Sequence, residues 1–148
     1  MKTDLVYWED EIGKTPKKIS VDASPCGVQI GKKGEWQMAV AAEDKKVEAN
    51  VLIPIKIQPI EVPEEAIVLP CIFMRHALGI VASIASVGMP KAVEEKRTIS
   101  QVLFHPIESG VIYKDELLAV INVLPATVEE ELPNKEAIYR WMQKRYEE

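Results

Sequence analysis

Hydrophobic residues recur at every second position in several short segments of the chain, which is the pattern of half-buried β-strands. Between Ile53 and Gln58, isoleucines alternate with proline, lysine and glutamine. The same alternation returns between Ile99 and Phe104. The three prolines between residues 54 and 63 lack the amide N–H that a sheet requires. The first of these strands must therefore lie at a sheet edge, at a strand end or at a bulge.

Further short apolar runs, bounded by glycine, proline or charged residues, predict the remaining strands. They comprise residues 5–8, 28–30, 35–40, 66–70, 80–87 and 117–125. The runs 80–87 and 117–125 contain few large polar groups, so we expect both to be buried. The segment from Gly31 to Gly34 is a turn signal and predicts a hairpin or a tight corner between the two runs beside it. Residues 88–98 combine a proline with a charged run and predict a loop.

The last part of the chain has helical periodicity. Asn134 is a good N-cap, and Ile138, Trp141 and Met142 share one face of a helix over about residues 134–147. Many short strands followed by one terminal helix predict a single, mainly β domain over residues 1–148, with a β core at about residues 5–125.

Composition and charge exclude several classes of protein. The 148 residues carry 18 basic and 23 acidic side chains, a net charge of −5, which argues against a general nucleic-acid surface. No run of 18 apolar residues predicts a transmembrane helix, and the first residues lack the apolar core of a signal peptide. We expect a cytoplasmic protein that binds neither nucleic acid nor membrane, with both cysteines reduced.

Assembly is a further expectation. Strands interrupted by proline, together with Trp36, Ile138 and Trp141, offer surfaces that a small domain does not bury alone. We therefore predict a homo-oligomer, either a dimer or a trimer.

The segment from Leu69 to Ile80 is the first candidate for a site, because it places a thiol, a guanidinium and an imidazole inside apolar sequence. Arg75 and His76, beside the backbone N–H groups of the turn at Gly79, could hold a phosphate or a carboxylate, with Cys71 nearby. The simpler alternative is that Arg75 pairs with one of the many carboxylates of the chain.

Two other chemistries fit the same residues. Cys26, Cys71, His76 and His105 are all the cysteines and histidines of the chain and would make a Cys₂His₂ zinc site. Their spacing does not match the paired ligands of structural zinc sites, and we expect no cofactor. Cys71 could also act as a nucleophile with a histidine as base, although a thiol after a proline at the end of an apolar strand is as easily a packed side chain.

The order of elements from about Val47 to Pro125 resembles the β-clip folds, especially the dUTPase-like nucleotidohydrolases. That resemblance implies a barrel or sandwich of short strands, with the segment from Pro70 to Ala77 where the phosphate motif of those enzymes falls. The serines of that motif are missing, and residues 89–99 contain neither the Asp that activates water nor the Tyr that stacks on the base.

A second resemblance rests on Leu69-Pro70-Cys71 followed by Arg75-His76-Ala77-Leu78-Gly79. This signature is similar to that of a small archaeal family of uncharacterised proteins, a domain of unknown function. The sequence therefore predicts a non-catalytic β domain that binds a small anionic ligand or a protein partner around residues 70–79. The alternatives are a divergent nucleotide hydrolase and a Cys₂His₂ metal-binding protein.

Overall fold

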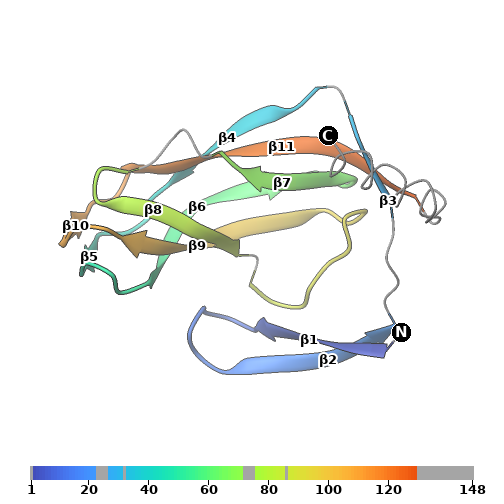
Figure 1. Cartoon of the computed structure of the whole chain (residues 1–148), viewed down its shortest axis with the longest axis horizontal. Helices are drawn as coiled ribbons and strands as arrows, with labels where there is room; N and C mark the ends of the chain where they lie inside the picture. Colours follow the sequence, from blue (N-terminus) through green and yellow to red (C-terminus); the bar gives the residue numbers. More distant parts are fainter. Residues whose placement is uncertain (1, 23–26, 32, 72–75, 86, 130–148) are drawn as a thin grey trace, which may run out of the picture.

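The computed structural model describes residues 2–22, 27–31, 33–71, 76–85 and 87–129, which form strands and connecting loops (Figure 1). The mainly β class is confirmed, and within these ranges no helix could cross a membrane. The predicted helix at 134–147 lies outside the described residues. The strands are β1 Lys2–Trp8, β2 Pro16–Asp22, β3 Gly27–Ile30, β4 Glu35–Val40, β5 Lys45–Val47, β6 Ile53–Val62, β7 Ala66–Pro70, β8 Gly79–Ala85, β9 Arg97–Pro106, β10 Gly110–Ile112 and β11 Leu117–Glu129.

Two antiparallel sheets make up the body of the molecule (Figure 1). In the four-stranded sheet, the long strand β11 pairs with β3 and β4 and also with β7. In the three-stranded sheet, β9 lies between β6 and β8. Two smaller pairs, β1 with β2 and β5 with β10, complete the described structure.

The core lies between the two sheets. Phe104 and Ile55 of the three-stranded sheet and Leu118 and Ile121 of β11 are fully buried in one cluster. Each such side chain contributes roughly 1.5–3 kcal/mol by leaving water. The alternation seen in the sequence therefore corresponds to one apolar face on each sheet.

The prolines of β6 lie where the sequence requires them. β6 is an edge strand, and its pairing with β9 shifts register between Lys56 and Ile60, across Pro59. The bulge also explains why the buried positions move from Ile55 to Ile60, a change of parity along the strand.

The hairpin predicted at residues 31–34 is wrong. β3 and β4 do not pair with each other, and each pairs antiparallel with a different part of β11. The glycines instead permit a close approach to β11. The Gly31 N–H donates to the Pro125 carbonyl over 2.7 Å, and a Cβ on Gly34 would lie 2.3 Å from the Leu124 side chain.

The prediction that residues 80–87 form a buried strand is also wrong in part. A strand is present, but Ile80 is 41% exposed and Ala82 and Ser83 are exposed as well. β8 is the edge strand of its sheet, so only part of its surface is covered. An apolar run in an edge strand looks the same in the sequence as one in a central strand.

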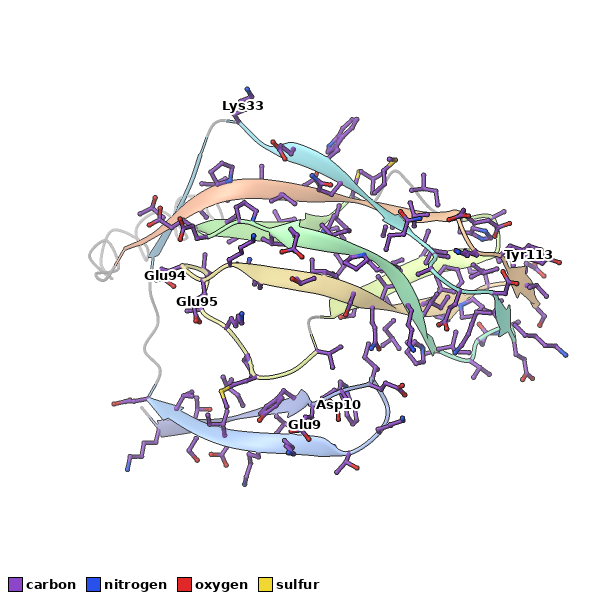
Figure 2. The ribbon with its side chains drawn as sticks, turned by 180° about the vertical axis from the view of Figure 1, so that it is seen from behind. Glu9, Asp10, Lys33, Glu94, Glu95 and Tyr113 are labelled. Carbon is purple, nitrogen blue, oxygen red and sulfur yellow. The ribbon has the colours of Figure 1, made fainter. Side chains whose placement is uncertain are left out.

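The β1–β2 hairpin lies beside β9 and the loop that precedes it (Figures 1 and 2). The connection depends on Gln101 of β9, whose side chain is only 7% exposed. Its amide donates to the Asp10 carbonyl over 3.3 Å and accepts from the Ile12 N–H over 3.5 Å. The Gly88 N–H adds a bond to the Trp8 carbonyl.

Candidate functional site

His76 lies just before β8, and both nitrogens of its ring are engaged. The Leu78 N–H donates to Nδ1 over 3.1 Å, and Nε2 lies 2.9 Å from Oε2 of Glu116. Because Nδ1 accepts a hydrogen bond, this arrangement requires the ring proton on Nε2, which donates to the carboxylate. The side chain is only 14% exposed, and the ring meets Phe104 edge-on with centroids 6.2 Å apart.

Glu116 extends this contact into the turn before β11. Its Oε2 atom also accepts from the Tyr113 N–H over 3.0 Å, while the backbone at Asp115 has φ of +71°. Aspartate tolerates this left-handed conformation better than most residues do. The carboxylate therefore ties the turn at 113–116 to the segment that carries His76.

Gly79 is a position of close backbone packing. It pairs with Pro106, and a Cβ at this position would lie 2.2 Å from the carbonyl oxygen of His105. A side chain of any kind would push β8 away from β9. This geometry accounts for the glycine without a ligand, and its role in binding stays a prediction.

The other described site candidates, Cys71 and His105, do not form a metal-ligand group with His76. The Cys71 N–H donates to the Val120 carbonyl over 3.0 Å, and its partly buried thiol is free. His105 is half-buried on β9, opposite Ile80. No group of three or more potential metal ligands occurs among the described residues. Cys26 and Arg75 lie outside them, so the Cys₂His₂ site stays a prediction.

A cavity of about 400 Å³ opens between β7 and β8. Within the described part of the chain, β7 pairs only with β11 and β8 only with β9, so the two sheets leave a gap between these strands. Most of its lining is apolar. The lining residues are Val68, Pro70, Val81, Ala82, Ser83, Ile84, Arg97 and Ile99.

Arg97 supplies the positive charge of this cavity. Its Nη1 donates to the carbonyls of Val93 and Glu95 over 3.3 and 3.4 Å, and its Nη2 donates to the Ala66 carbonyl. Among the ion pairs of the described residues, none involves Arg97. The guanidinium is therefore held by neutral oxygens and has no ion-pair partner within the described ranges, at the wall of an apolar cavity.

The two acidic residues closest in sequence do not neutralise this charge. Figure 2 shows Glu94 and Glu95 on the loop that leads into β9. The Glu95 carboxylate accepts from the Ala92 N–H of the same loop over 2.9 Å. Glu61, on β6, binds the Thr98 hydroxyl and lies 3.8 Å from the Lys96 ammonium.

The sequence interpretation missed Arg97 because it placed residue 97 in the charged loop. A signal was present: residue 97 has the same parity as Ile99 and Gln101, which are both buried on β9. In a strand, residues of equal parity share a face. A basic residue on the same face of a strand as buried residues is a better candidate for a binding site than one in an exposed charged run.

Comparison with known proteins identifies the family. Residues 2–110 match the family described as "Domain of unknown function DUF22". The chain belongs to this family. The DUF22 match includes His76, Gly79 and Arg97 and ends before Glu116.

An archaeal relative of this DUF22 chain is the "Uncharacterized protein MJ0614" of Methanocaldococcus jannaschii, which is 24% identical over 113 residues. The alignment covers 76% of this chain and 86% of the relative. No solved structure matches the chain. The expected membership in an archaeal family of unknown function is confirmed, whereas the likeness to dUTPase-like enzymes stays a prediction.

Proposed function

We propose that this DUF22 protein is a non-catalytic, cytoplasmic binding domain whose cavity between β7 and β8 holds a small carboxylate with an apolar body. The observation that carries the proposal is Arg97, a charged group bonded to three neutral carbonyls at the wall of an apolar cavity. A buried or half-buried cation without a counterion favours an anionic partner.

The remaining donors of Arg97 suit one carboxylate. A guanidinium has five N–H donors, and three of them are bonded to carbonyls. The other two donors have no partner in the part of the chain that the structure describes, and they are enough for a single bidentate contact. The net charge of −5 opposes a polyphosphate more strongly than a singly charged ligand.

The walls of the cavity suit the rest of such a ligand. Val68, Ile84 and Ile99 present aliphatic surface, and Ser83 contributes the one hydroxyl among the described lining residues. A volume of about 400 Å³ falls within the range of small-molecule sites, roughly 300–1,000 Å³. The described lining includes no carboxylate, histidine or cysteine, the groups that most often act as base or nucleophile.

The segment predicted from the sequence borders this cavity. Cys71 follows the lining residue Pro70, and Gly79 and Ile80 precede the lining residue Val81. The chain from Cys71 to Gly79 therefore connects the two strands that form the walls. The roles of Arg75 and His76 in binding stay predictions, as do the hydrolase and zinc alternatives.

Binding of straight-chain carboxylates tests the proposal. We expect hexanoate to bind more tightly than acetate in calorimetry or NMR titration, because a longer chain covers more of the apolar wall, and hexanol to bind weakly. Arg97→Gln should weaken hexanoate binding by about tenfold or more, equivalent to roughly 1.4 kcal/mol.

Lys96→Gln is the matched control, because it removes a positive charge at the neighbouring residue. The Lys96 side chain is 70% exposed and lies near Glu61. We expect this variant to bind hexanoate like the unchanged protein. An equal loss of hexanoate affinity in both variants would overturn the proposal. So would the absence of binding at about 10 mM hexanoate, a concentration about ten times a Kd of 1 mM.

A further inference from the structure

The outer face of the four-stranded sheet carries exposed apolar side chains beside the strand β4. Trp36 and Leu69 flank Asn122 in one row across the sheet, and they are 74% and 44% exposed. Met38, two residues further along β4, is 62% exposed. Large apolar groups gathered at this density on one face are typical of an interaction surface.

One edge of the β4 backbone faces away from β11. The Val120 carbonyl accepts from the Cys71 N–H, so the backbone groups of Val120 point toward β7 and those of Ile121 point toward β4. Ile121 pairs with Gln37, which therefore uses its N–H and C=O on β11. By alternation, the N–H and C=O of Trp36 and Met38 point away from β11.

The outer edge of β4 meets β6 just past its end, where Ala41 pairs with Ile57 and the Ala42 N–H donates to the Lys56 carbonyl over 2.9 Å. Further back, the outward groups of Trp36 and Met38 have no strand partner within the described residues. β6, one of the two edge strands of the three-stranded sheet, carries Pro54 and Pro59, which protect it against pairing with another chain. β4 contains no proline and one charged residue, Glu35. β4 is therefore less protected than β6.

We infer that β4 pairs antiparallel with β4 of a second copy of this chain, about a twofold axis at Gln37. In this register the outward-pointing backbone groups of Trp36 meet those of Met38 in the second copy, so each pair exchanges two hydrogen bonds. The two four-stranded sheets then continue into each other across the axis.

The side chains of β4 are self-complementary in this register. Trp36 lies opposite Met38 of the second copy on the exposed face, where sulfur and aromatic ring make a favourable contact. Glu35 lies opposite Ala39 of the second copy, so the two carboxylates are separated by about 13 Å along the strands, at about 3.3 Å per residue. A partner of different sequence would not provide this match on both sides of the axis.

Disulfide trapping tests the register. In a background with Cys26 and Cys71 replaced by serine, Gln37→Cys should form an intermolecular disulfide under mild oxidation. Residues on the axis form a non-hydrogen-bonded pair with Cα atoms about 4.5 Å apart, within the range that a disulfide spans. Glu35→Cys is the matched control and should not crosslink, because Ala39 lies opposite it. Equal crosslinking of both variants, or of neither, would overturn the register.

Light scattering after gel filtration tests the edge itself. We expect twice the chain mass of 16.6 kDa for the unchanged protein. Met38→Pro removes only an outward N–H and should give a folded monomer, as judged by an unchanged far-UV CD spectrum. Val51→Lys introduces a charge at a 51% exposed position in the loop before β6, outside this face, and should remain dimeric. A monomer at all concentrations would overturn the proposal.

Discussion

His76 and Arg97 are both basic side chains held by backbone groups at the margin of the core, yet their partners differ in charge. His76 accepts from one amide and donates to the carboxylate of Glu116, so its hydrogen-bonding capacity is complete. Arg97 donates to three neutral carbonyls and makes no ion pair among the described residues. A polar group inside apolar sequence therefore marks a site only when the structure leaves its charge or its hydrogen-bond donors unmatched.

The greatest loss of stability should follow a substitution that separates the backbone around His76 from β9. Gly79→Ala should destabilise the protein by about 3 kcal/mol or more, because the new Cβ would lie 2.2 Å from the His105 carbonyl oxygen and neither backbone can move freely. Urea unfolding measures the loss.

Gly13→Ala serves as the control for Gly79→Ala. Gly13 has φ of +88° with no atom within 4 Å of the added Cβ, so only the backbone conformation opposes the substitution. We expect a cost of about 1–2 kcal/mol there. If the two alanine variants were equally stable, close packing would not be the reason for glycine at residue 79.

A smaller effect should follow from removing the imidazole alone. His76→Ala leaves the Leu78 N–H and one acceptor site of Glu116 without their partner and removes the ring from Phe104. We expect a loss of about 2–3 kcal/mol in the free energy of unfolding.

The free energy of unfolding of Arg97→Gln can be compared directly with that of His76→Ala. Its carbonyl partners are neutral and the guanidinium charge is uncompensated, so we expect a loss of about 1 kcal/mol or less. A greater loss of stability from Arg97→Gln than from His76→Ala would show that Arg97 is the structural residue of the two.

The smallest effect concerns exposed charges on the β1–β2 hairpin, which provide a third kind of environment. The pKa of Asp4 is lowered from its usual value of 3.8, chiefly because the Ser20 hydroxyl donates to it and also because of Lys18. A lowered pKa contributes stability that is present above about pH 4 and is lost as the pH falls through the folded value.

Unfolding free energies measured between about pH 5 and pH 2 should therefore fall less steeply in Asp4→Asn than in the unchanged protein. Ser20→Ala should remove most of the same dependence, because that hydroxyl is the principal cause of the shift. Identical acid profiles in all three proteins would show that the hairpin charges do not contribute to stability.

Local patterns predicted most of the strands, because alternation reports directly which positions face a core. The alternation from Ile53 to Gln58 located β6, and the prolines correctly indicated an edge and a bulge. Pairing could not be predicted in the same way. The segments before and after Gly31–Gly34 look like the two arms of a hairpin, and only contact with residues 117–129 places both on β11.

The candidate site was predicted only in part. The segment from Cys71 to Gly79 drew attention through its composition, and it connects the walls of the cavity. Its histidine, however, is matched by Glu116, a residue 40 positions away that no local pattern links to it. Arg97 was not predicted as a site residue because three charged residues precede it and suggest a loop. Its position, in step with residues 99 and 101, was the signal that it faces inward.

The position of β11 has a consequence for how the chain acquires its structure. β3, β4 and β7 all take their pairing partner from a strand that is synthesised after them. On a ribosome these three segments must therefore wait, unpaired, until residues 117–129 have emerged. Sheets that close on a late strand fold slowly and expose apolar edges meanwhile. The nascent chain should thus depend on chaperones that shield such segments until translation reaches β11.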